Sequence, residues 1–213
     1  MSGSGTNLQA ILDAAAIPGY PAEVALVLSD KLGVYALDRA MHAGVATEVV
    51  TWEGHGGDRH AFTQAIVAVL DKYEVDFVVL AGFMRILTEE ICEAYPGNLL
   101  NTHPSLLPAF RGAHAVEDAL ASGVKIAGVT IHIVVPEVDA GPIIAQETVP
   151  VLPGDTSDLL HERIKQVEHR LFPEVIADWA VGRYVVDGDV VRDMRPRRAA
   201  NDPETNFTRK DSE

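Results

Sequence analysis

The 213-residue sequence contains a single cysteine, Cys92. One thiol forms no disulfide within the chain and no thiolate cluster around a metal, which favours a reducing compartment such as the cytoplasm. Long apolar runs are also missing. None approaches the roughly 20 residues of a transmembrane helix, and the N-terminus lacks the basic segment and apolar stretch of a signal peptide. We therefore expect a soluble, cytoplasmic protein.

Positive charge is the second shortage. The chain has 17 Lys and Arg against 31 Asp and Glu, which gives a formal net charge of −14. Nucleic acids and anionic membranes are held through clustered Lys and Arg, so neither is expected as a partner. An anionic small molecule must instead be captured locally, by backbone N–H groups and a few cations.

Apolar residues make up 47% of the chain, enough for one sizeable core. Helical and strand-like patterns alternate through the first half. This order predicts an α/β fold with a doubly wound, mostly parallel sheet, in which ligands lie at the carboxyl ends of the strands. The expected helices cover 8–15, 36–41 and 58–73, and the expected strands cover 22–29, 46–50 and 75–82.

The second half predicts longer elements and a small appendage. An Asp-Gly step between apolar runs over 183–194 predicts a hairpin, and the polar residues after 196 predict a disordered tail. We expect one main domain over 1–182, and the hairpin and tail over 183–213. The expected helices cover 88–94, 115–122 and 156–179, with Asp155 or Thr156 as the N-cap of the last, and the strands cover 125–135 and 143–151.

The segment SGSGTN at 2–7 alternates glycine with small polar residues and leads into a helical pattern. Glycine lets consecutive backbone N–H groups converge on one oxygen cluster, so the segment predicts a phosphate site at a helix N-terminus. It matches neither the dinucleotide-binding fingerprint nor the Walker motif. An ordinary N-capping turn is an equally good interpretation of these residues alone.

A second polar cluster combines an amide, imidazoles and a carboxylate. Asn101 and His103 face the same side of an extended segment, His132 lies in the long expected strand, and Asp139 lies in the loop after it. These groups suit general acid–base catalysis without a covalent intermediate. Three alternatives stay open: Asp139 as a turn residue, His132 as a core histidine, and a metal site built from His103, His132 and Asp139.

Six segments occur in the order and spacing of a known family. They are SGSGTNL at 2–8, AGFMRIL at 81–87, NTHPSLLPAFRG at 101–112, GVTIHIV at 128–134, DAGPII at 139–144 and ERIKQVEHRLFP at 162–173. In these segments the chain resembles the phosphoribosylglycinamide formyltransferases, folate-dependent enzymes of purine synthesis. The resemblance implies a Rossmann-like formyltransferase fold.

The resemblance also implies an activity: transfer of the formyl group of 10-formyltetrahydrofolate to the glycyl amine of glycinamide ribonucleotide. The implied partners are these small molecules only, with a monomer or homodimer as the oligomeric state. No metal is expected, because an imidazolium and an amide already serve the oxyanion. The implied catalytic residues are Asn101, His103 and Asp139, supported by His132 and Thr130, which do not contact the reacting atoms themselves.

The same resemblance implies two sets of binding residues. Lys165 and Glu168 are three residues apart on the last long helix, so an ordinary helix ion pair is an alternative interpretation of that pair. The implied phosphate and ribose ligands are Ser4, Gly5, Thr6, Asn7, Lys165 and Glu168. The implied folate ligands are Met84, Arg85, Ile86, Leu87, Val134, Val135, Pro136, Glu137 and Val138.

The sequence departs from the resembled family at its start. That family has a strand before the glycine-rich segment, and we expect this first strand to be missing here, which leaves backbone groups of the sheet unpaired. A misassigned start or a truncation would explain this, and an extended chain is expected to be more stable and more active. The alternative functions are another formyl-folate enzyme, either a hydrolase or a tRNA formyltransferase, and a non-catalytic folate- or nucleotide-binding protein.

Overall fold

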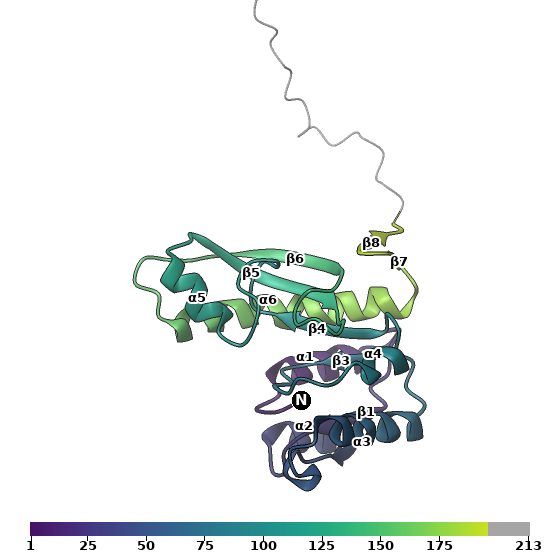
Figure 1. The fold of residues 1–213 in the computed structure, drawn as a ribbon. Helices are drawn as coiled ribbons and strands as arrows, with labels where there is room; N and C mark the ends of the chain where they lie inside the picture. The colour runs from purple at the N-terminus through teal and green to yellow at the C-terminus, as the bar shows by residue number, and fades with distance from the viewer. Residues whose placement is uncertain (196–213) are drawn as a thin grey trace, which may run out of the picture.

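A computed structural model describes residues 1–195, so the tail expected after 196 lies outside the described residues. Helices and strands alternate through the first half, and the strands lengthen in the second (Figure 1). The helices are α1 (Thr6–Ala15), α2 (Tyr35–His42), α3 (Arg59–Lys72), α4 (Glu90–Ala94), α5 (Ala115–Ser122) and α6 (Ser157–Ala180), with a 3-10 turn η1 (Glu53–His55). The strands are β1 (Leu26–Ser29), β2 (Ala46–Val49), β3 (Val78–Leu80), β4 (Leu99–His103), β5 (Ile126–Ile133), β6 (Ile143–Pro150), β7 (Tyr184–Asp187) and β8 (Val190–Asp193).

The strands form three groups. β1 pairs with β2, a four-stranded sheet runs in the order β3-β4-β5-β6, and β7 pairs with β8 in a hairpin. Pairing is parallel between β1 and β2 and between β3 and β4, whereas β5 is antiparallel to both of its neighbours. The expected α/β architecture is therefore confirmed as a mixed sheet, whose parallel part comes from the first half of the chain.

β4 shows how helices cover both faces of the sheet. Leu99 and Leu100 are both fully buried, and successive side chains of a strand point to opposite faces. Leu99 packs in one cluster with Phe62 of α3, and Leu100 packs in another with Phe172 of α6. The core therefore has two layers, with α3 and α4 on one side of the sheet and α1 and α6 on the other.

Two strands are shorter than the sequence predicts. The apolar runs 22–29 and 75–82 predict buried central strands, but the ladders of β1 and β3 cover only Leu26–Ser29 and Val78–Leu80. Every residue of β3 is only half-buried. A strand extends as far as its neighbours pair with it, and β1 and β3 each have a paired neighbour on one side only.

Polar caps fix where the two longest helices begin. The Asp58 carboxylate accepts from the backbone N–H groups of His60 and Ala61 at the start of α3. The Thr156 hydroxyl accepts from the N–H of Leu159 at the start of α6, so Thr156 is the N-cap of the last helix. Such a cap contributes about 1 kcal/mol, because it gives a partner to backbone N–H groups that have none within the helix.

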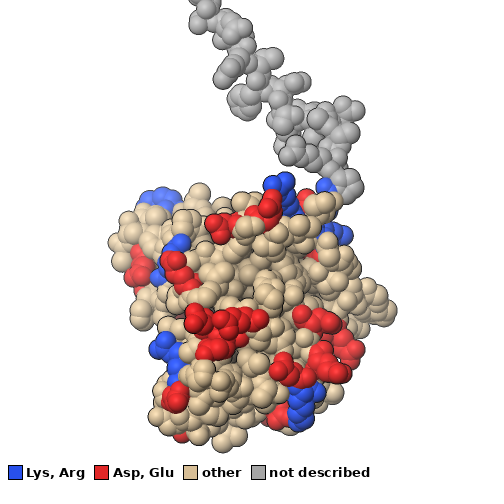
Figure 2. Space-filling view, turned by 45° about the vertical axis from the view of Figure 1, so that its right-hand side comes forward, with Lys and Arg blue, Asp and Glu red and all other residues tan. Residues whose placement is uncertain are grey.

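The distribution of charge on the surface reflects the excess of Asp and Glu over Lys and Arg in the sequence. On the face shown in Figure 2, Asp and Glu gather in groups across the middle of the molecule, and Lys and Arg lie mostly toward the edges. Within residues 1–195, no helix combines the length and the apolarity needed to cross a membrane. A phosphate that binds this protein must therefore be held by local groups rather than by a basic surface.

Candidate active site

Strands β4 and β5 bring the first catalytic candidates together. Their antiparallel register sets Asn101 opposite His132 and His103 opposite Thr130. The Asn101 amide nitrogen lies 3.2 Å from His132 Nε2, and His132 Nδ1 lies 2.9 Å from the carbonyl oxygen of Ile133. When Nδ1–H donates to that oxygen, Nε2 of the neutral ring accepts from the amide. An amide carries two N–H donors, so the second is left for a ligand.

Asp139 reaches the same place from the loop after β5. Its φ of 51° lies in the left-handed region, which Asp adopts more readily than most residues. One carboxylate oxygen lies 3.6 Å from His132 Nε2, and the other lies 3.4 Å from His103 Nδ1. The second oxygen also accepts from the N–H of Gly112 at 2.9 Å. The carboxylate does more than shape a turn, because it faces two buried imidazoles.

The loop that carries Asp139 depends on Gly141. A Cβ at this position would lie 1.9 Å from the carbonyl oxygen of Ile133, closer than atoms approach, so only glycine fits. The close approach lets the loop fold back on β5, where the N–H of Ile133 donates to the carbonyl of Pro142 at 2.9 Å. The glycine therefore fixes the path that aims Asp139 at the histidines.

Asp139 is ionised at neutral pH. Burial on its own would raise the pKa of Asp139, but the neighbouring His132 and His103, together with the hydrogen bond from the N–H of Gly112, hold it below its usual value. His103 is itself buried, and its Nε2 lies 2.8 Å from the carbonyl oxygen of Phe110. A protonated His103 therefore has an acceptor at each ring nitrogen, the Phe110 carbonyl and the Asp139 carboxylate.

A buried hydroxyl fastens the loop that follows His103. The Thr130 hydroxyl donates to the carbonyl of Ser105 at 2.7 Å and accepts from the N–H of Leu107 at 3.0 Å. Gln146 on β6 donates to the same hydroxyl and to the Leu107 carbonyl, each at 2.9 Å. Sequence reasoning missed Gln146. The signal lay in the pairing of β5 with β6, which sets Gln146 opposite Thr130.

The glycine-rich segment ends at the N-terminus of α1. Gly5 is the N-cap and has a φ of 73°, and a Cβ there would lie 2.7 Å from the side chain of Ala36 on α2. Among the described residues, no side chain caps this helix and its first turn carries no acidic group. The first N–H groups of a helix have no partner within it. Those of Thr6 and Asn7 are therefore available to an anion.

Glu168 links the glycine-rich segment to the catalytic strand. It lies on α6 and is only 4% exposed. One carboxylate oxygen accepts from the hydroxyl of Thr102 at 2.9 Å, and the other accepts from the amide of Asn7 at 3.2 Å. Because Thr102 lies between two catalytic candidates on β4, this buried carboxylate holds the start of α1 at a fixed place beside them.

The cations Lys165 and Arg39 have different partners. Lys165 pairs with Glu162 at 2.7 Å, so the alternative of a Lys165–Glu168 ion pair is not found. Arg39 on α2 donates through Nε to the carbonyl of Ser4 at 2.9 Å and through Nη1 to Gln9 at 2.8 Å. Sequence reasoning missed Arg39, because it is far from Ser4 along the chain and belongs to no motif.

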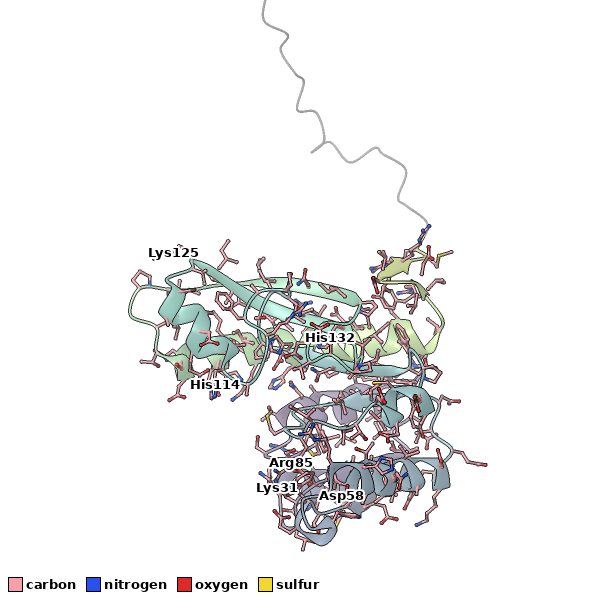
Figure 3. All side chains as sticks on the ribbon, viewed as in Figure 1. Lys31, Asp58, Arg85, His114, Lys125 and His132 are labelled. Atoms are coloured by element: carbon pink, nitrogen blue, oxygen red, sulfur yellow. The ribbon has the colours of Figure 1, made fainter. Side chains whose placement is uncertain are left out.

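The segment implied to contact folate presents both apolar and charged groups. The Arg85 guanidinium lies 3.1 Å from the fully buried carboxylate of Asp30 and 5.4 Å from the ring centre of Trp52. Met84 and Ile86, on either side of it, are 72% and 55% exposed. Leu87 packs inward with the α3 cluster. Figure 3 shows Arg85 in the lower half of the molecule and His132 in the sheet above it.

The second implied folate segment is the loop after β5. The N–H of Val134 donates to the carbonyl of Leu99 at 2.7 Å, which ties the start of the loop to β4. Glu137 pairs with Arg111 at 2.9 Å. Val138 is 45% exposed, and Val135 and Pro136 complete the segment. The loop is therefore anchored at its base and offers backbone and apolar groups at its tip.

The metal alternative gains no support from the geometry. Across residues 1–195, no group of three or more His, Cys, Asp or Glu side chains is arranged to hold a metal ion. Asp139 lies 3.4 Å from His103 and 3.6 Å from His132, and each contact is an ion pair when the histidine is protonated.

Comparison with known proteins agrees with this architecture. Residues 1–176 match the family described as "Formyl transferase". The chain is 42% identical to the phosphoribosylglycinamide formyltransferase of Escherichia coli (strain K12) over 183 residues, which is 86% of each chain. It superposes with a TM-score of 0.87 on the crystal structure of glycinamide ribonucleotide transformylase 1 from Symbiobacterium toebii, with 46% identity over 91% of each chain.

Longer proteins also contain a similar segment. The chain is 46% identical over 184 residues to the "Trifunctional purine biosynthetic protein adenosine-3" of Gallus gallus. The matched segment is 85% of this chain but only 18% of that protein, so the chain spans less than a fifth of the length of such relatives. The resemblance predicted from the six sequence segments is confirmed.

Proposed function

The chain belongs to the formyl transferase family, and on that premise we propose that it transfers the formyl group of 10-formyltetrahydrofolate to the glycyl amine of glycinamide ribonucleotide. The observation that carries the proposal is the convergence of Asn101, His103 and Asp139. The glycine-rich segment lies next to them, held through Glu168. One site therefore offers acid–base groups for the transfer and backbone donors for a phosphate.

The transfer proceeds by direct attack of the amine on the formyl carbon. The carbon becomes tetrahedral and its oxygen becomes negatively charged. The second N–H of Asn101 is one donor for that oxygen, and protonated His103 is the other, through the Nε2–H that exchanges the Phe110 carbonyl for the substrate. The Asp139 carboxylate, 3.4 Å from His103, stabilises the positive ring and accepts the proton that the attacking nitrogen must lose.

Collapse of the intermediate breaks the bond between the formyl carbon and the folate nitrogen. His103 then donates its proton to the leaving nitrogen, so the products are the formylated amine and tetrahydrofolate. His132 and Thr130 take no proton in this scheme. His132 holds the Asn101 amide at 3.2 Å, and Thr130 fastens the backbone that follows His103.

The phosphate of the ribonucleotide binds at the start of α1. Ser4, Gly5, Thr6 and Asn7 supply backbone and side-chain donors there, and Lys165 supplies a charge from α6. The helix dipole adds a partial positive charge at the same point. The Glu168 carboxylate has acceptor positions beyond the two that Asn7 and Thr102 occupy, and these receive the ribose hydroxyls.

The folate binds between two segments. Its ring packs on Met84, Ile86 and Leu87, and the loop from Val134 to Val138 supplies backbone groups to its polar edge. Arg85, held by Asp30, attracts the carboxylate end of the ligand. The reaction assigns no step to a metal.

The wider assignments follow from the same proposal. The partners of the enzyme are its small-molecule substrates, and they include neither nucleic acid nor membrane. The enzyme is cytoplasmic and acts as a monomer or homodimer. Residues 1–182 form the catalytic domain, and the hairpin of β7 and β8 is an appendage to it.

The decisive experiment follows release of tetrahydrofolate from 10-formyltetrahydrofolate with and without glycinamide ribonucleotide. Release that requires the amine supports the proposal. Release without the amine would identify a hydrolase, and binding of the folate without release would identify a binding protein. The His103→Asn variant is expected to abolish release, whereas His161→Asn, which removes an exposed histidine on α6, is the matched control.

A further inference from the structure

The two substrates of the proposed reaction are bound by separate parts of the chain. We call the glycine-rich residues 2–7 the phosphate segment and Met84–Leu87 the folate segment. The folate segment lies between β3 and α4 and belongs to no helix or strand. An irregular segment is held in place by the hydrogen bonds that its backbone makes with neighbouring elements. The partners of the folate segment therefore decide where the folate lies.

Ser2 joins the phosphate segment to the folate segment. It is the first residue of the phosphate segment and is buried, with 6% of its surface exposed. Its N–H donates to the carbonyl of Gly82 at 3.1 Å, and its hydroxyl accepts from the N–H of Met84 at 2.9 Å. The second of these bonds ties the hydroxyl of one segment to the first backbone N–H of the other.

The far end of the folate segment is held by a second buried hydroxyl. The Thr63 hydroxyl accepts from the N–H of Thr88 at 3.0 Å and donates to the carbonyl of Arg59 at 2.9 Å. Thr63 is fully buried and belongs to α3, on the face of the sheet opposite α1. The two ends of the folate segment are therefore tied to different parts of the fold, and Ser2 is the tie to the phosphate segment.

We propose that Ser2 is a positioning residue that couples the two substrate sites, so that each substrate strengthens the binding of the other. This inference rests on the proposed function. A phosphate at the N–H groups of Thr6 and Asn7 orders the phosphate segment, and Ser2 passes that order to Met84. A folate that binds second then meets an ordered segment and loses less entropy. By linkage, the same factor applies in both directions.

The size of the coupling is limited by the bond between Ser2 and Met84. One hydrogen bond of this kind is equivalent to about a threefold to tenfold change in an equilibrium constant. Saturating glycinamide ribonucleotide is therefore expected to lower the Kd of tetrahydrofolate by about threefold to tenfold. Tetrahydrofolate carries no formyl group, so its complex with the ribonucleotide does not react, and titration calorimetry measures both Kd values at equilibrium.

Two variants each remove one hydroxyl and differ in what that hydroxyl connects. Ser2→Ala keeps the backbone bond to Gly82 but removes the acceptor for the N–H of Met84. Its ratio of the Kd values without and with the ribonucleotide is expected to fall to about one. Thr63→Val removes the acceptor for the N–H of Thr88 and keeps the shape of the side chain. It is the matched control: tetrahydrofolate should bind about threefold more weakly, with the ratio still about threefold to tenfold.

Native-state hydrogen exchange follows the same contact in the chain without substitutions. The ribonucleotide should slow exchange of the Met84 amide by at least about threefold and leave the Thr88 amide within about twofold, because Thr63 holds the latter in both states. In Ser2→Ala the Met84 amide should exchange faster and no longer respond to the ribonucleotide. Melting curves show whether each variant is folded.

Binding of both ligands with a Kd ratio of about one in the unsubstituted chain would overturn this inference alone. A ratio that Ser2→Ala leaves unchanged, or that Thr63→Val abolishes equally, would also overturn it. If Ser2→Ala does not fold, the Met84 amide of the unsubstituted chain decides, and exchange that ignores the ribonucleotide contradicts the coupling. Failure of either ligand to bind would instead refute the proposed function, and this inference with it.

Discussion

The Asp139→Asn variant tests the charge at the centre of the candidate site. Asn has nearly the same shape and also adopts the left-handed backbone that this position requires. The variant therefore removes the negative charge and leaves the fold in place. His103 then loses its only carboxylate neighbour within ion-pair distance among the described residues.

The expected loss can be worked out from the geometry. Two unit charges 3.4 Å apart attract by about 5 kcal/mol at an effective dielectric constant of about 20, which is an upper limit. Removal of one partner from a buried hydrogen-bonded charge pair costs about 2–5 kcal/mol. Because the transfer requires the protonated His103 ring, a loss of about 3–4 kcal/mol in its stabilisation corresponds to a turnover roughly 10²–10³ times lower.

Steady-state kinetics of formyl transfer measure this loss. Circular dichroism and the melting curve show whether the variant is folded, and Asp118→Asn, which neutralises an exposed carboxylate on α5, is the matched control. An Asp139→Asn enzyme that keeps kcat within about tenfold of the original would refute the role of the carboxylate, because less than about 1.4 kcal/mol would then depend on it.

Three further changes have expected outcomes. Arg39→Met should raise KM for glycinamide ribonucleotide about tenfold and leave kcat within about threefold, because Arg39 holds Ser4 and no reacting group; a change confined to kcat would contradict this. Burial lowers the pKa of the Met1 ammonium to about 5, so the free energy of unfolding should fall by up to about 1.4 kcal/mol per unit as pH falls from 8 to 5. The reason is that the unfolded state binds the proton over that range and the folded state does not. N-terminal acetylation should therefore remove the dependence of the unfolding free energy on pH, and the same dependence in the acetylated chain would refute this assignment. Burial raises the pKa of the Cys92 thiol, so this thiol should react with a thiol reagent more slowly at pH 8 than free cysteine does. Equal reaction rates would argue against the raised pKa.

Most elements of the fold were predictable because each has a local cause. α5 begins and ends where the periodicity indicates, and α6 begins at one of the two N-caps considered. β1 and β3 are the exceptions. Apolar composition predicts how far a segment can be buried in a sheet, whereas the length of a ladder depends on a neighbouring strand that is distant in sequence.

The candidate site was predictable to the extent that its residues lie close together in the sequence. Asn101 and His103 share a strand, so their common orientation follows from the period of two. Arg39 and Gln146 were missed because each reaches its partner through tertiary packing. The contact of Glu168 with Thr102 belongs to the same class, since no pattern on α6 indicates which residue of β4 it meets.

These long-range contacts connect the phosphate site with the catalytic strand. The start of α1 is held by Glu168 through Asn7, by Arg39 through Ser4, and by the backbone of Met1 and Ser2, which donate to the carbonyls of Leu28 and Gly82. Catalysis depends on placing the amine within reach of the formyl carbon, and small displacements of a bound substrate are costly in rate. Changes to these contacts are therefore expected to act on substrate positioning, while the contacts of Asp139 with His103 and His132, which involve no residue before 103, remain as they are.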